Sequence, residues 1–185
     1  MAVVGLVGLV GPARADVIDL PETRAELTLD VRVWRAVTTA HATAGTTSGL
    51  VAAYATDREL LAITRAQLPN IDAWRAKHRD AYIEQIERGL VNAGYKPSGR
   101  KLTTIEGVPV LDLEATPSGT ATSSPSNASG SSSAPRKRQP IVLRVILFRT
   151  YALSLALEGP RSSRTKLRAI AKTFVPPPAR PEGSP

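Results

Sequence analysis

The sequence predicts an α+β fold, in which an antiparallel β-sheet is covered by one long helix and one short C-terminal helix. Two kinds of periodicity support this prediction. Several runs of strand length alternate or concentrate apolar residues, and two other segments repeat them every three or four positions. The order along the chain is strands, long helix, strands, short helix, which is typical of an α+β layout.

The first strands are predicted before residue 70. In residues 27–33 every second residue is Leu or Val, which indicates a half-buried strand. Apolar runs at 49–55 (GLVAAYA) and 60–66 (LLAITRA) predict two more strands. The four residues between those runs, 56–59, have the length of a hairpin turn.

The clearest helix lies between Asn70, which can cap its first turn, and Gly94, which stops it. Between them, mostly apolar residues recur at helical spacing: Ile71, Trp74, His78, Ala81, Tyr82, Ile86, Leu90 and Ala93. We expect this stripe to pack on the sheet.

After this helix the pattern returns to strands. Residues 101–105 and 108–115 are predicted to be strands on either side of a turn at 106–107. The runs at 141–148 and 151–158 are the most apolar in the chain. Because each has the length of a strand and is too short to cross a membrane, we predict central strands.

A short helix is predicted to close the fold. Gly159 and Pro160 end the last strand, and Ser162 or Ser163 can cap the helix. Its apolar stripe consists of Leu167, Ile170, Ala171 and Phe174.

Composition excludes several kinds of site. The 185 residues contain no cysteine, which excludes disulfides, thiolate nucleophiles and cysteine-bound zinc. Two histidines, His41 and His78, are too few for a histidine-built metal site. Aromatic residues make up 4% of the chain, which leaves little for base stacking. We therefore predict no catalytic residue, no metal and no cofactor.

The chain is predicted to have three parts. Residues 1–15 have the pattern of a signal peptide, because an uncharged apolar stretch is followed by a Gly-Pro break and by Ala-Arg-Ala before Asp16. We expect export to the periplasm or the extracellular space of a bacterium. Residues 16–175 are predicted to form a single α+β domain with a disordered Ser-rich loop at 116–139. Residues 176–185 are predicted to be a disordered Pro-rich tail.

Several of these features occur together in one family. They are the helix end at 90–95 (LVNAGY), the strand start at 106–110 (EGVPV), the hairpin at 144–158 with Tyr151 at its bend, and the closing helix with Phe174. Over residues 26–175 the chain resembles the PsbP/DcrB-like α/β/α sandwich family of small exported proteins. The resemblance implies the fold described above and the role of a binding or assembly module.

Positive charge is concentrated at the C-terminal end. Residues 116–185 carry 11 basic residues against two acidic ones, a net of +9, whereas 16–115 are nearly neutral. The candidate binding residues lie on and just before the last helix: Arg161, Arg164, Arg168 and Lys172. The last three repeat every four residues, opposite the apolar stripe. Such a stripe could bind an acidic partner or a membrane surface, and the alternative is a solvated helix face.

Two carboxylates are a further candidate. Asp112 and Glu114 alternate along one predicted strand and therefore share a face, with Glu106 nearby in sequence. Two carboxylates on one face could perform acid–base chemistry or bind a cation, but a solvated strand face accounts for them more simply. His78 is expected to be a packed, hydrogen-bonded residue of the long helix, and His41 to lie in a loop.

These observations favour an exported, non-catalytic binding or scaffolding domain, either a monomer or a weak homo-oligomer. One alternative is a hydrolase-type enzyme, which would require a concave pocket that joins Asp112 or Glu114 to a second polar group. The other is an intracellular basic protein that binds nucleic acid through residues 136–172. Nucleic acid is not the expected partner of an exported protein.

Overall fold

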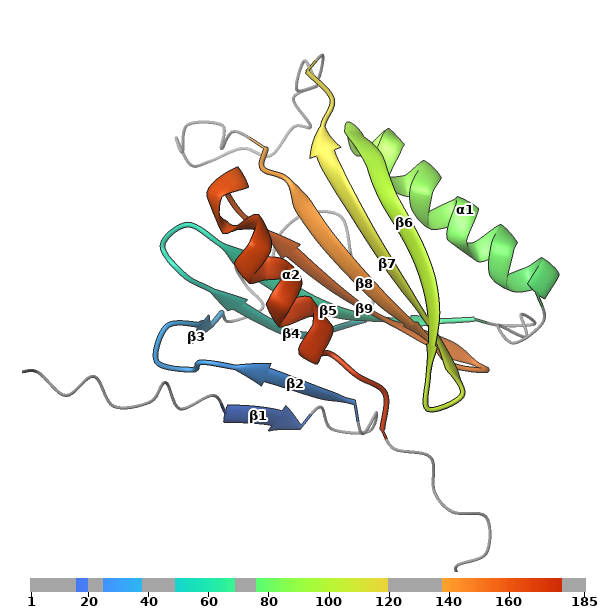
Figure 1. Ribbon diagram of the computed structural model, residues 1–185, viewed down its shortest axis with the longest axis horizontal. Coiled ribbons are helices and arrows are strands. Elements are labelled where there is room, and N and C mark those ends of the chain that lie inside the picture. Colours follow the sequence, from blue (N-terminus) through green and yellow to red (C-terminus); the bar gives the residue numbers. More distant parts are fainter. Residues whose placement is uncertain (1–15, 20–24, 38–48, 69–75, 120–137, 178–185) are drawn as a thin grey trace, which may run out of the picture.

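A sandwich of helices and one large sheet forms the centre of the computed structural model (Figure 1). The structure describes residues 16–19, 25–37, 49–68, 76–119 and 138–177. All neighbouring strands of the large sheet are antiparallel, in the order β3-β4-β5-β9-β8-β7-β6. These strands are β3 (Arg35–Ala36), β4 (Leu50–Ala55), β5 (Leu60–Gln67), β6 (Tyr95–Ile105), β7 (Val108–Pro117), β8 (Ile141–Leu147) and β9 (Tyr151–Glu158).

The remaining elements cover this sheet. Its two faces carry α1 (Ala76–Asn92) and α2 (Arg164–Thr173), the latter preceded by the 3₁₀ turn η2 (Arg161–Ser163). A separate hairpin of β1 (Asp16–Asp19) and β2 (Glu26–Leu29) lies beside α2 (Figure 1). The predicted α+β class, with one long and one short C-terminal helix over an antiparallel sheet, is confirmed.

Each face of the sheet has its own core because side chains alternate along every strand. On the α2 face, residues of β5, β8 and β9 meet Leu27, Leu29 and Trp34, and the apolar side of α2 joins them with Leu167, Ala171 and Phe174. On the α1 face, Ile83 packs with Leu111, Leu113, Leu143, Val145 and Leu147. The predicted interior position of the strands now labelled β8 and β9 is thereby confirmed.

The first predicted strand is too long. It ends at Leu29, because Asp30 starts a turn in which its carbonyl accepts hydrogen bonds from the amides of Val33 and Trp34. The turn buries Trp34, which is 2% exposed, and leaves Val31 44% and Val33 49% exposed. The predicted alternation placed the valines inside and the tryptophan outside, and it was wrong here because the larger ring gains more from burial.

The predicted stripe of α1 is confirmed in part. Tyr82, Ile86 and Leu90 pack half-buried against the core of this face, at the edge of the sheet beside β6. Ile83 is the fully buried residue of this helix, although the stripe omitted it, whereas Ala81 is exposed. Its end at Gly94, which has a φ of 79°, is as predicted. Asn70, Ile71 and Trp74 lie outside the described residues.

Three boundaries of the predicted disordered segments are wrong, one of them at 139, where the half-buried Gln139 donates its backbone amide to Glu158. Residues 116–117 belong to β7, and the amide and hydroxyl of Ser118 both donate to the carbonyl oxygen of Gly94. At the start of the predicted C-terminal tail, Pro176 is buried. It follows Val175, which forms two backbone hydrogen bonds with Glu26. Residues 120–137, 178–185 and the predicted signal peptide lie outside the described residues. No helix in the described part of the chain is long and apolar enough to span a bilayer.

Candidate binding surface

Helix α2 brings most of the predicted binding residues together. Leu167, Ala171 and Phe174 fasten its apolar side to the sheet, each with at most 3% of its surface exposed. Neither serine caps it through its side chain: Ser163 is the N-terminal boundary residue, and its side chain makes no capping hydrogen bond to the helix. The helix is therefore held by its buried stripe and by the charged contacts described next.

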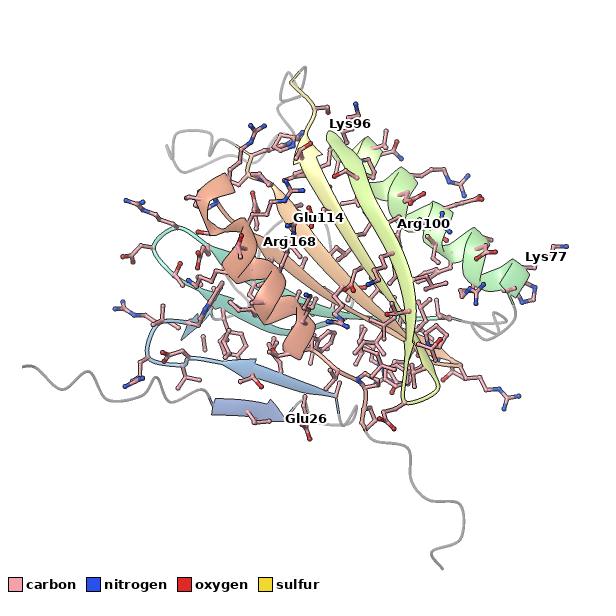
Figure 2. All side chains as sticks on the ribbon, viewed as in Figure 1. Glu26, Lys77, Lys96, Arg100, Glu114 and Arg168 are labelled. Atoms are coloured by element: carbon pink, nitrogen blue, oxygen red, sulfur yellow. The ribbon has the colours of Figure 1, made fainter. Side chains whose placement is uncertain are left out.

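Glu114 of β7 is bound by two arginines of α2. The Nε of Arg164 donates to its Oε2 over 2.8 Å, and the Nη2 of Arg168 donates to the same oxygen over 2.9 Å. Figure 2 labels Glu114 on the sheet and Arg168 on α2. A second, shorter contact joins each arginine to the carboxylate. The hydrogen bonds from Arg168 lower the pKa of Glu114 most; burial opposes them, and Arg164 adds to the lowering. Glu114 thus neutralises part of the positive charge of two residues of the predicted basic stripe.

Arg144 of β8 lies beneath the end of α2 and is 4% exposed. Its Nη1 donates to the carbonyl of Ala171 over 3.0 Å, and its Nε lies 3.4 Å from Oδ1 of Asp112. Burial raises the pKa of Asp112, and this outweighs the lowering by Arg144, Lys101 and Lys172. Asp112 and Glu114 therefore share the face that the alternation predicted, but each faces a different arginine.

The other predicted binding residues remain open to solvent. Arg161 and Lys172 are exposed, and neither side chain makes a hydrogen bond or an ion pair with another described residue. They are the cations of the predicted set whose charge the described part of the fold leaves unpaired.

One ion pair of this region was not predicted. Glu59, in the turn between β4 and β5, is 7% exposed and accepts a hydrogen bond of 2.7 Å from the Nζ of Lys166. Burial raises the pKa of Glu59, but hydrogen bonds from Lys166, Ser163 and Thr56 outweigh it, so the pKa is lowered. Lys166 also lies 5.5 Å from the centre of the Trp34 ring. No sequence signal could have found this pair, because its members are 107 residues apart.

Asp112 and Glu114 do not line a substrate cavity in the described structure. The hollow beside Glu114 has a volume of about 10 Å³, which is room for about one water molecule. Among the described residues, no three His, Asp or Glu side chains are grouped so that they could hold a metal ion. His78 lies half-buried on α1, as predicted, but its buried Nδ1 has no hydrogen-bond partner among the described residues, so the predicted hydrogen bond is not found at this atom. His41 lies outside the described residues.

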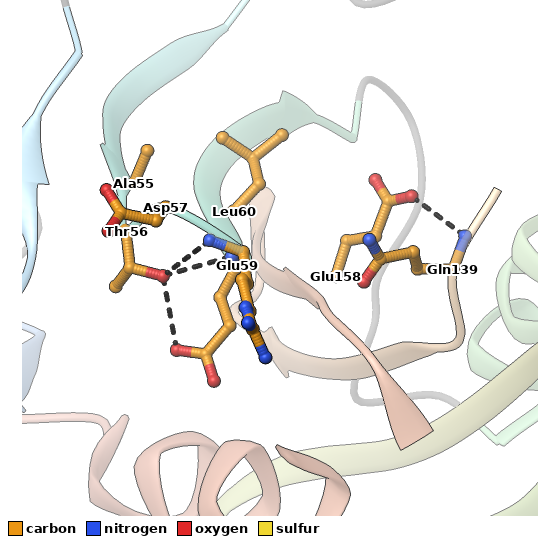
Figure 3. A pocket seen from close by; sticks show the side chains of 8 residues that line it. Ala55, Thr56, Asp57, Glu59, Leu60, Gln139 and Glu158 are labelled. Atoms are coloured by element: carbon orange, nitrogen blue, oxygen red, sulfur yellow. Dashed lines mark hydrogen bonds between the residues drawn. The ribbon is translucent and has the colours of Figure 1, made fainter. Parts of the chain in front are cut away.

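Larger hollows surround the β4–β5 turn instead. One of about 370 Å³ is lined by that turn together with Leu60, Gln139 and Glu158 (Figure 3). Hydrogen bonds hold its walls: the hydroxyl of Thr56 accepts from the amide of Glu59, and the amide of Gln139 donates to Glu158. Two more, of about 390 and 250 Å³, lie on the side of the same turn that faces Val33.

The architecture is similar to that of cyanobacterial PsbP (CyanoP) from Synechocystis sp. PCC 6803, known from its solution structure. The two agree with a TM-score of 0.59 over 93% of this chain and 98% of that chain. The chain has a PsbP-like fold. With 12% identical residues, the PsbP similarity concerns the fold alone. No family model and no curated protein matches the sequence.

Proposed function

We propose that this PsbP-like chain is an exported, non-catalytic binding domain that docks on an anionic partner through the basic side of α2. The observation that carries the proposal is the charge of this side. Five cations at 161–172 meet two carboxylates, Glu59 and Glu114, which leaves a net charge of +3. An excess of one sign on one side of a protein attracts partners of the opposite sign.

Two further observations support a binding role. Asp112 and Glu114, the carboxylates of the hydrolase alternative, face arginines, and the hollow beside Glu114 is too small for a substrate. The resemblance to the PsbP/DcrB-like family implies a binding or assembly module as well.

The signal-peptide pattern of residues 1–15 supports export. Asp16 as the first residue of the purified native protein is the expected result of N-terminal sequencing.

The test uses the two unpaired cations, because changing Arg164 or Arg168 would also release Glu114. We expect the variant Arg161→Gln/Lys172→Gln to elute from a heparin column at lower salt than the wild type. The matched control is Lys77→Gln/Arg88→Gln, which removes the same charge from exposed positions of α1. Equal elution of the two double variants would contradict the proposal, because retention would then depend on net charge and not on α2.

A further inference from the structure

The turn after β2 presents apolar side chains to solvent in a fixed conformation. We call residues 30–35 the valine turn. The carbonyl of Asp30 accepts from the amides of Val33 and Trp34, and its carboxylate accepts from the amide of Arg32 over 3.1 Å. Because the buried Trp34 anchors the turn to the core, Val31 and Val33 are held outward.

Exposed apolar side chains are concentrated at this end of the molecule. The described residues include five large apolar side chains that are exposed: Val17, Val31, Val33, Leu60 and Val91. Three of them, Val31, Val33 and Leu60, lie at one end of the sheet, where Ala55 pairs with Arg35 on one side and with Leu60 on the other. The valine turn and the β4–β5 turn project from the same side of the molecule (Figure 1). A local concentration of this kind indicates a contact surface.

Cations surround these side chains. Arg32, Arg35 and Arg58 are exposed, and Arg161 and Lys166 follow at the start of α2. Four carboxylates lie among them: Asp30 pairs with Arg32, Glu59 pairs with Lys166, Asp57 lines both hollows beside Val33, and Glu158 is the strand partner of Leu60. The five cations and four carboxylates leave this end with a net charge of +1.

Hollows on either side of Val33 add polar donors. The one of about 390 Å³ is lined by Arg32, Arg35 and Asp57, and the one of about 250 Å³ by Arg58, Lys166, the two serines of η2 and the carboxylates of Asp57 and Glu59. Arginine, lysine and hydroxyl side chains are the groups that bind phosphate oxygens. Val33 is the apolar side chain that lies between these two hollows. This arrangement fits a surface in which phosphate groups lie directly above hydrocarbon chains.

We propose that this end of the molecule docks on an anionic lipid bilayer, with Val31 and Val33 entering the headgroup region and the surrounding arginines binding lipid phosphates. The inference rests on the proposed function and names its partner. Apolar side chains that enter the interface next to basic residues that attract anionic lipids are the general means by which proteins lie on membranes. The aliphatic stems of arginine can follow the valines inward while the charged heads stay at phosphate level.

The absence of cysteine allows a direct test in the full chain. We would introduce a single cysteine by Val33→Cys, label it with an environment-sensitive fluorophore, and add vesicles of phosphatidylglycerol and phosphatidylcholine. The expected result is a blue shift and a rise in emission that vesicles of phosphatidylcholine alone do not produce. The matched control is Val91→Cys, an equally small apolar residue exposed on α1, whose label should not respond.

Variants separate the two parts of the contact. Val31→Ser/Val33→Ser should weaken co-sedimentation with the anionic vesicles about tenfold, because less apolar surface leaves water. Arg35→Gln/Arg58→Gln should weaken it as well and reduce its dependence on salt, whereas Lys77→Gln/Arg88→Gln should bind like the wild type. All of these positions are exposed, so the fold should persist.

Three outcomes would overturn the inference: no vesicle binding by the wild type, binding without a spectral change at position 33, or equal changes at positions 33 and 91. The first, together with heparin retention that depends on Arg161 and Lys172, would leave the proposed function standing and direct it to a protein or nucleic-acid partner. Insertion at position 33 with retention independent of α2 would instead overturn the role of that helix.

Discussion

Glu114 is bound by two arginines, opposite to it in charge, that lie one helical turn apart, Arg164 and Arg168. This pairing decides which cations of α2 remain unpaired. A carboxylate that accepts hydrogen bonds from two guanidinium groups is stabilised in its charged form, so its pKa falls. Asp112, two residues away on the same face, has its pKa raised by burial despite the nearby Arg144. Two carboxylates of the same strand therefore have pKa values shifted in opposite directions, and the surroundings of each side chain decide which.

Replacing Glu114 with Gln should lower the free energy of unfolding at neutral pH by about 1–3 kcal/mol, the usual value of hydrogen bonds to a charged group. Because the folded pKa of Glu114 is lowered, its contribution is complete above the pKa of an unfolded glutamate. It is lost as the pH falls through the lowered folded value. Urea unfolding of both proteins along a pH series should show the difference disappearing in acid.

Asp112 makes a pH-dependent contribution to stability of the opposite sign. Because the wild type and Glu114→Gln both retain Asp112, this contribution cancels when their free energies of unfolding are compared. Glu84→Gln, at an exposed position of α1, is the matched control and should change stability by less than about 0.5 kcal/mol. A difference between wild type and Glu114→Gln that stayed constant down to low pH would show that the carboxylate charge is not what stabilises the contact.

At the scale of elements, α2 is attached to the sheet by an apolar stripe and by one buried cation. Arg144 lies in a row of the α2 face that continues through Leu155 and Ile63. It binds a carbonyl near the C-terminal end of the helix, where cations are stabilised by the helix dipole. Its side chain is 5% exposed, so among the described residues the groups that compensate it for lost water are Asp112 and the carbonyl of Ala171.

Arg144→Ala should therefore cost about 3–5 kcal/mol, because it leaves Asp112 and a helix carbonyl without their partner. The double variant Arg144→Met/Asp112→Leu should recover most of this loss, since it replaces the whole pair with apolar side chains in an apolar row. Denaturant unfolding of the wild type and both variants measures this directly. A double variant no more stable than Arg144→Ala would mean that the pair fixes the position of α2 in a way that packing cannot replace.

At the scale of the whole molecule, the longest stretch outside the described residues joins two neighbouring strands. Ala115 of β7 pairs with Ile141 of β8, so residues 120–137 connect strand ends that already lie side by side. The cost of closing such a connection rises by only about 0.6 kcal/mol for each doubling of its length. Stability should accordingly depend little on how long this segment is.

Replacing residues 120–137 with a short Gly/Ser turn should leave the thermal midpoint within a few degrees of the wild type, about the effect of 1 kcal/mol or less. A deletion that starts at residue 116 is the matched comparison. It should cost more, because Thr116 and Pro117 pair with Lys96 and Tyr95 of β6. Loss of cooperative unfolding in the shorter deletion, followed by circular dichroism, would show that the segment is part of the fold.

The sequence by itself determined the features that depend on local periodicity and local turns. The strands at 50–55, 60–67 and 141–158 follow from their apolar runs, and the buried side of α2 follows from Leu167, Ala171 and Phe174. Side-chain direction in a strand or helix is fixed by its repeat, so neighbours along the chain suffice to predict it. The choice of Arg164, Arg168 and Lys172 as a basic stripe depended on the same repeat.

Tertiary structure alone decided which of those charges remain available and which apolar residues face water. Glu114 is 50 and 54 residues away from the arginines that bind it, so no local pattern could indicate that two of the four cations are paired. In the valine turn, period-2 alternation placed Val33 inside, but the core had space for the ring of Trp34, and the chain turned at Asp30 to fill it. Charge pairing and core filling are settled by distances between segments far apart in the sequence, and those distances exist only once the sheet has formed.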